Sequence, residues 1–220
     1  MIGRGEHILH TAHEVKTARK AFKRLQHFFG EKKDDPSAKF PELNALVKEI
    51  RSTNGQEAII LKNGGSVEFV ARSKGSARGF TIDIVIMDEA QQIDDDALEA
   101  LGPTTRAAPL KNRQFIWTGT PPKPDENGEV FTRIRMQALE GKATRACWHE
   151  WSMNEDADLD SPIEWALSNP ALGYRLDIDV VVEDRETYSD EGFARECGGC
   201  WKFAGTGAVI DADSWRAVGD

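Results

Sequence analysis

Apolar positions recur along the chain with two different periods, and segments of the two kinds alternate. Short apolar runs predict strands at 7–12, 58–61, 66–70, 82–87, 114–117 and 144–151. Repeats of three and four residues predict helices at 14–29, 41–50, 94–101 and 130–139. Gly30 is a stop signal after the first helix, and Asp94 is the expected N-cap of the third. Alternation of strands and helices indicates an α/β protein.

The runs 82–87 and 114–117 are apolar at nearly every position, which is typical of strands buried on both faces of a parallel sheet. Polar residues follow both runs directly. We therefore expect part of a doubly wound sheet with helices on both faces, in which ligands bind at the carboxyl ends of the strands. From about residue 152 the pattern changes to acidic and mainly helical, with apolar spacing over 180–188 and 193–201, so a small helical subdomain is expected there.

Charge is distributed unevenly over the 220 residues. The chain has 28 Lys and Arg against 37 Asp and Glu, a formal charge of −9, and residues 151–220 hold 16 of the acidic side chains but only 5 basic ones. The net charge argues against nonspecific binding of nucleic acid, whereas a local basic face in the first half is compatible with phosphate contacts. The competing interpretation is a solvated helix face. The predicted helix 14–29 carries most of these cations: Lys16, Arg19, Lys20, Lys23 and Arg24.

No apolar run approaches the roughly 18 residues that a membrane helix needs, and the N-terminus has no export signal. Three cysteines cannot form a disulfide framework, so a reducing cytosol is the simplest setting. Cys197 and Cys200, with Cys147 and His149 upstream, have spacing that suits zinc. Against this, Cys197 falls where the helix pattern requires an apolar residue, which favours buried free thiols.

Two adjacent carboxylates, Asp88 and Glu89, end the apolar run 82–87. A nucleoside-triphosphate site requires this arrangement, because one carboxylate serves the magnesium shell and the other polarises the attacking water. A buried strand would hold both groups rigidly, and this chemistry depends largely on positioning. The alternative is a strand that simply ends in acidic side chains at the surface.

Further polar residues support the first interpretation. Thr118, Gly119 and Thr120 end the run 114–117, where small hydroxyl side chains can respond to the γ-phosphate, although the same residues also form ordinary turns. Arg78 lies in a Gly-flanked basic loop, from which it could reach the phosphates of a neighbouring subunit as an arginine finger. An exposed loop arginine without such a role is the alternative.

Taken in order, these segments resemble the large terminase subunit of tailed bacteriophages, the motor that pumps DNA into procapsids. The stretch 10–13 resembles the segment after the family's nucleotide-binding loop, 77–91 resembles the approach to its Walker B strand and that strand itself, and 118–120 matches its coupling motif. The segment that resembles the family's linker contains Trp165, 169–173, 193–196 and Trp201.

The resemblance implies a P-loop (ASCE-type) motor fold and a set of residue roles. Asp88 would serve magnesium through water, Glu89 would be the catalytic carboxylate, and Arg78 would be the trans-acting finger. Thr118, Gly119 and Thr120 would couple hydrolysis to movement. It also implies that the nucleotide is ATP. The implied partners are double-stranded viral DNA, the small terminase subunit and the portal protein. The complete motor would be a homo-oligomeric ring in the cytoplasm of the bacterial host, without membrane association.

The sequence departs from the family at both ends. It contains no G-x-x-x-x-G-K-[ST] loop, and it stops near the expected start of the nuclease domain. We expect a partial ATPase domain at 1–151, a helical linker at 152–205 and the start of a truncated nuclease domain at 206–220. Such a fragment is expected not to bind or hydrolyse ATP alone.

Two other functions remain open. A superfamily 2 helicase fragment is suggested by the DEAD-like run at 88–91, although such enzymes need a second RecA-like domain. A non-catalytic assembly or DNA-binding piece of a packaging motor is favoured by the missing phosphate loop.

Overall fold

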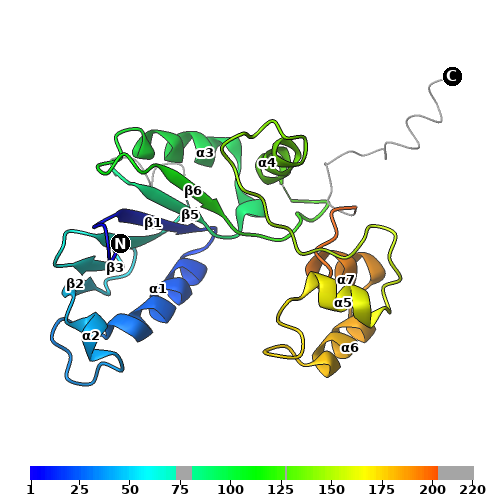
Figure 1. Cartoon of the computed structure of the whole chain (residues 1–220), viewed down its shortest axis with the longest axis horizontal. Coiled ribbons are helices and arrows are strands. Elements are labelled where there is room, and N and C mark those ends of the chain that lie inside the picture. Colours follow the sequence, from blue (N-terminus) through cyan, green and yellow to red (C-terminus); the bar gives the residue numbers. More distant parts are fainter. Residues whose placement is uncertain (73–80, 127, 203–220) are drawn as a thin grey trace. The chain divides into compact units, whose positions relative to one another are not determined.

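A six-stranded sheet in the order β2-β3-β4-β1-β5-β6 forms the centre of the first part of the chain (Figure 1). Strands β4, β1, β5 and β6 are parallel to one another, whereas β3 pairs antiparallel with β4 and β2 pairs antiparallel with β3. The strands are β1 (His7–Ala12), β2 (Val47–Arg51), β3 (Ala58–Leu61), β4 (Ser66–Ala71), β5 (Ile84–Met87) and β6 (Gln114–Trp117). The α/β prediction is confirmed, and β4 and β1 are the central strands.

The computed structural model describes residues 1–72, 81–126 and 128–202. Contacts within the chain divide it into two compact units, Met1–Gly119 and Thr120–Asp220. The division falls between Gly119 and Thr120, within the three expected coupling residues. The helix over 129–139 contacts Trp201 near the end of the described residues through Phe131 and Arg135, in agreement with its place in the second unit. The assignment of motor, linker and nuclease segments stays a prediction.

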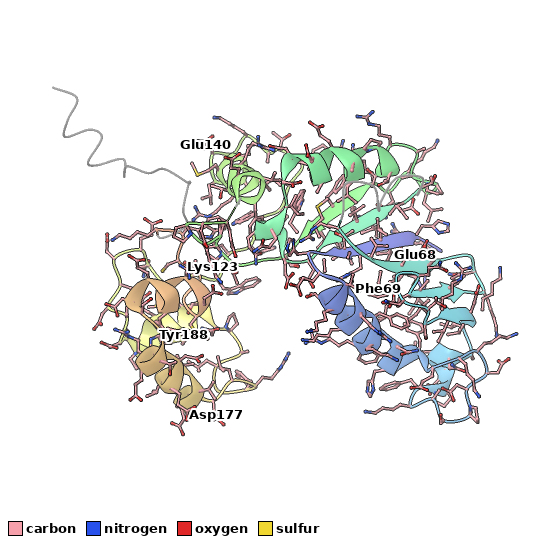
Figure 2. The ribbon with its side chains drawn as sticks, turned by 180° about the vertical axis from the view of Figure 1, so that it is seen from behind. Glu68, Phe69, Lys123, Glu140, Asp177 and Tyr188 are labelled. Atoms are coloured by element: carbon pink, nitrogen blue, oxygen red, sulfur yellow. The ribbon has the colours of Figure 1, made fainter. Side chains whose placement is uncertain are left out.

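Helix α1 (Val15–Phe29) covers one face of the sheet and ends at Gly30, as predicted. Its apolar side chains join those of β2, β3 and β4 in a buried cluster. Phe22 meets Phe69 of β4 edge to face at a ring separation of 5.5 Å, and Figure 2 shows Phe69 on the α1 side of β4. Gly30 adopts a φ of 88°, and a Cβ there would lie 2.7 Å from the Asn44 amide, which instead caps α1 by donating to the Phe29 carbonyl.

Helix α3 (Asp95–Leu101) lies on the opposite face of the sheet from α1 (Figure 1). The Asp94 carboxylate accepts a hydrogen bond of 2.7 Å from the Ala97 amide, so the predicted N-cap is confirmed. Two short 3-10 turns flank this helix, η1 (Ala90–Gln92) and η2 (Gly102–Thr105). Helices thus cover both faces, as expected for a doubly wound sheet.

The predicted helix at 41–50 is wrong beyond its first turn. Only α2 (Pro41–Asn44) is helical, and the chain then continues as strand β2. Val47 is fully buried, and β2 pairs antiparallel with β3 with an irregular register between Val47 and Glu49. The open edge of β3 offers hydrogen bonds that outweigh the weak helical preference of this short segment.

Strand β6 exists as predicted but is not buried. Its side chains alternate between exposed and partly exposed, and Ile116 retains 42% of its accessible surface. The position in the sheet explains this, because β6 pairs with β5 on one side only and forms an edge. The apolar sequence therefore predicted the strand correctly, but its burial on both faces was predicted wrongly.

The described part of the second unit, up to residue 202, contains four helices: α4 (Glu129–Leu139), α5 (Pro162–Ser168), α6 (Ile178–Thr187) and α7 (Asp190–Glu196). The last three share a buried core around Met153, Trp165, Val181 and Phe193. This core agrees with the helical character expected from residue 152 onward.

An aromatic cluster joins α4 to this helical region. Phe131 and Trp148 both pack against Trp201, and the guanidinium of Arg135 lies 4.6 Å from the centre of the Trp201 ring. Arg135 also forms two hydrogen bonds, of 2.7 and 2.8 Å, with the Glu150 carboxylate. The strand predicted at 144–151 is wrong: these described residues form no strand, since their aromatic side chains pack on other rings and not in a sheet.

Candidate functional site

The carboxylate of Asp88 lies at the carboxyl end of β5, beside the end of β6. These strands are parallel neighbours, so the residues that follow them meet at one edge of the sheet. The Thr118 hydroxyl lies 3.1 Å from Asp88 Oδ1, and the main-chain amide of Glu89 donates to the same oxygen at 3.1 Å. A further bond from the Ala90 amide to the Thr118 carbonyl, at 2.9 Å, ties the two loops together. The structure thus brings Asp88, Glu89 and Thr118 into one site.

His10 of β1 approaches the other oxygen of Asp88. Its Nε2 lies 3.6 Å from Asp88 Oδ2, and its ring rests on Phe69 at a centroid distance of 5.2 Å. Burial lowers the pKa of His10 below its ordinary value of 6.5, although Asp88 opposes this shift and Arg72 adds to it. At neutral pH the imidazole is therefore uncharged and forms a polar contact with Asp88, not a salt bridge.

Arg72, directly after β4, fixes the main chain of the site. Its guanidinium donates to the carbonyl oxygens of Thr11, Asp88 and Glu89 at 3.2, 2.5 and 2.9 Å. Burial lowers the pKa of Arg72 to about 10, with Glu89 and Asp88 opposing the shift, so the side chain is charged at neutral pH. The sequence showed Arg72 only as the first residue of a basic loop. Its partners are main-chain carbonyls far along the chain, which leave no side-chain pattern to detect.

Glu89 has an unusual main-chain conformation. Its φ of 52° and ψ of 55° place it in the left-handed region, which a residue with a Cβ rarely adopts. Such strain is found where surrounding contacts over-determine the conformation, and the bond from Arg72 to the Glu89 carbonyl is such a contact. The turn starts η1 immediately after the carboxylate pair, so the chain leaves the sheet edge with both side chains partly exposed.

The site fits a magnesium ion held by one carboxylate. Asp88 Oδ1 already accepts two hydrogen bonds, whereas among the described residues Oδ2 has only the 3.6 Å contact with His10, and 37% of the side chain is exposed. Magnesium keeps several waters and typically uses one or two carboxylates together with substrate phosphates. In the described ranges no three His, Cys, Asp or Glu side chains gather as a metal cage, so any magnesium here would depend on water and phosphate.

The structure shows no hydrogen bond with Asp88 for the remaining described site residues, Gly119 and Thr120. Gly119 and Thr120 are exposed and follow Thr118 in an irregular segment at the boundary between the two units. Arg78 lies outside the described residues, so its proposed role as an arginine finger stays a prediction.

The candidate zinc ligands do not form a site within the part of the chain that the structure describes. Cys147 is exposed with its sulfur 3.2 Å from His149, whereas Cys200 is buried and directs its thiol toward the Met153 carbonyl. Burial raises the pKa of Cys197 to about 11 and also raises that of Cys200, which favours protonated thiols over metal ligands.

Comparison with known proteins places the fold. No family model and no curated protein matches the sequence. The large terminase of bacteriophage HK97 superposes with a TM-score of 0.74 at 19% identity, over 90% of this chain and 40% of that one. The large terminase of the thermophilic bacteriophage D6E matches with a TM-score of 0.56 at 12% identity, over 90% of this chain and 41% of that one.

The ATPase domain of the Thermus phage P74-26 large terminase matches with a TM-score of 0.56 at 16% identity, over 91% of this chain and 78% of that domain. The predicted resemblance is therefore confirmed for the fold, which is that of phage large terminases, and the chain spans about two fifths of the HK97 and D6E proteins. Within the described residues, no helix combines the length and apolar character needed to cross a bilayer.

Proposed function

We propose that this chain is part of a phage large terminase, a motor that uses ATP hydrolysis to move double-stranded viral DNA into procapsids. The observation that carries the proposal is the placement of Asp88, Glu89 and Thr118 at one edge of a sheet with the large-terminase fold. Open α/β sheets bind ligands at this edge. A buried strand fixes the carboxylates, as phosphoryl transfer requires.

Each residue then has a defined task. Asp88 would hold magnesium through water, because its Oδ1 is engaged by Thr118 and the Glu89 amide. Glu89 orients and polarises the attacking water. When bound, magnesium neutralises charge on the phosphates. Because Thr118 bonds Asp88 and is followed by the boundary between the two units, it is suited to couple the state of the site to movement, together with Gly119 and Thr120.

The 220 residues contain no G-x-x-x-x-G-K-[ST] sequence, whose backbone amides and lysine cradle phosphates in this class. We therefore propose that the polypeptide alone binds ATP weakly and does not turn it over. One of the similar solved structures, the D6E large terminase, is a complex with ADP. The complete motor is proposed to act as a homo-oligomeric ring with the small subunit and the portal protein, in the cytoplasm of the bacterial host.

Titration calorimetry and a phosphate-release assay test the proposal. The 220-residue polypeptide should show negligible turnover, whereas a polypeptide extended at its N-terminus by an added segment that carries a G-x-x-x-x-G-K-[ST] loop should hydrolyse ATP. Glu89→Gln should reduce that turnover by at least about a hundredfold with little effect on nucleotide affinity. Equal turnover in Glu89→Gln and wild type would refute the assigned role.

The same assays distinguish the alternatives. If the extended polypeptide binds no magnesium–ATP, the chain is a non-catalytic component of the motor. If turnover depends on single-stranded nucleic acid, the helicase interpretation is correct. Mixing Arg78→Ala with Glu89→Gln subunits tests the trans-acting finger, because complementation between the two inactive variants requires it.

A further inference from the structure

Helix α1 presents a strongly basic face, here called the α1 basic face. At 100° per residue, its cations fall within an arc of about 140° around the helix. The helix itself contains no Asp or Glu, so no carboxylate on α1 compensates them. The face consists of Lys16, Arg19, Lys20, Lys23 and Arg24.

These five side chains are exposed, and none forms an ion pair with any residue in the described ranges. Lys23 donates to the Gln26 side chain at 2.7 Å and lies 5.9 Å from the Phe22 ring, which keeps its charge at the surface. Some cations elsewhere, such as Arg51, Arg135 and Arg185, contact carboxylates, whereas the α1 basic face gathers five cations without such a contact. An uncompensated basic cluster on a chain of net charge −9 therefore indicates an external anionic partner.

The opposite side of α1 packs against the sheet over most of its length, and Val15 and Phe28 at its ends are exposed. Ala18, Phe22, Gln26 and Phe29 are buried against the sheet, so the cations are presented by a rigid helix. A helix that lies in a membrane surface needs its apolar side free to enter the lipid. Here that side is buried in the protein core, which argues for a partner recognised by charge alone.

We propose that the α1 basic face binds the phosphate backbone of double-stranded DNA. The inference rests on the proposed packaging function, which provides DNA as the anionic partner. From Lys16 to Arg24 the cations extend over about 12 Å along the helix axis, enough to contact several phosphates. Lys and Arg contacts to phosphates carry no sequence information, as a motor acting on DNA of any sequence requires.

Fluorescence anisotropy with a short labelled duplex tests this inference on the 220-residue chain. The variant Lys16→Gln/Lys20→Gln/Arg24→Gln removes three cations from the face. The matched control Lys48→Gln/Arg106→Gln/Lys111→Gln removes three exposed cations from other segments, with the same change in net charge. Circular dichroism and urea unfolding establish that both variants fold like the wild type.

The α1 variant should lose more than about tenfold in affinity at about 50 mM salt, and the slope of log affinity against log salt should fall in magnitude by about 2.7, while the control changes little. Equal losses in both variants would mean nonspecific attraction and overturn the inference. Absence of binding by the wild-type chain at low salt would overturn it as well. In either case the ATP hydrolysis assays still decide the packaging function independently.

Discussion

The Nη2 atom of Arg72 lies 2.9 Å from the main-chain carbonyl oxygen of Glu89, a residue held in the left-handed region at a φ of 52°. The same guanidinium bonds the carbonyls of Asp88 and Thr11, so one side chain joins the ends of β4, β1 and β5. The position of the Asp88 and Glu89 carboxylates therefore depends on Arg72, which follows β4 and lies at the end of neither β5 nor β6.

Removal of the guanidinium should destabilise the first unit. Arg72→Met should lower the free energy of unfolding by about 1–3 kcal/mol, because the Asp88 carbonyl loses the Arg72 donor, while the carbonyls of Thr11 and Glu89 keep only their main-chain donors. Arg72→Lys retains the charge but cannot span three carbonyls, so it should fall between Met and the wild type. Urea denaturation measures both values. Indistinguishable stability of Arg72→Met and wild type would show that water replaces these bonds at no cost.

The strain at Glu89 predicts a difference between two substitutions that both delete its carboxylate. Glu89→Gly should be more stable than Glu89→Ala by about 1 kcal/mol, because glycine adopts the left-handed conformation without a Cβ clash, which outweighs its greater freedom in the unfolded chain. Thermal or urea unfolding of the two variants gives the comparison directly. A more stable alanine variant would contradict the strained conformation.

The Arg135–Glu150 pair should make a pH-dependent contribution to the free energy of unfolding of the second unit. Burial alone would raise the pKa of Glu150, but hydrogen bonds from Arg135 and Trp148 outweigh it and lower the pKa below the ordinary value of 4.5. A carboxylate with a lowered folded-state pKa stabilises the fold above its unfolded-state pKa, and this contribution is lost as the pH falls through the folded-state value.

Glu150→Gln should therefore cost about 1 kcal/mol at neutral pH, and the difference from wild type should close as the pH falls below 4.5. Urea unfolding of both proteins at several pH values between neutral pH and below 4.5 measures this difference. Glu186→Gln, at an exposed position of α6, is the control and should show no difference at any pH. If Glu150→Gln lowered the free energy of unfolding equally at acidic and neutral pH, the cause would be lost packing and not the lost charge.

The three thiols should differ in reactivity. Cys147 is exposed and should be alkylated first, whereas Cys197, with a pKa of about 11, and buried Cys200 should react at least about tenfold more slowly near pH 8. Mass spectrometry of partially alkylated protein assigns the order. Equimolar zinc should not protect any of them, and strong protection of Cys197 and Cys200 together would revive the metal hypothesis.

Sequence pattern predicted the central strands, α1 and the Asp94 cap because local signals and tertiary packing agree there. It failed at 41–50 and 144–151, where pairing with β3 and aromatic packing on Trp201 override local preference. The carboxylate pair and Thr118 were found because parallel strands bring their carboxyl ends together. Arg72 and His10 were missed, since a donor to distant carbonyls and a ring beside Asp88 become visible only when β4, β1 and β5 are aligned.

Strand β6 has one consequence for handling the polypeptide. Among the residues that the structure describes, no strand pairs with the outer side of β6, which carries main-chain donors and acceptors next to the exposed Ile116. Such a margin is a template for pairing between chains, and β6 has no lysine or proline to discourage it. Concentrated preparations should therefore tend toward edge-to-edge aggregation, and a charged residue at position 116 is the most direct way to keep the molecules dispersed.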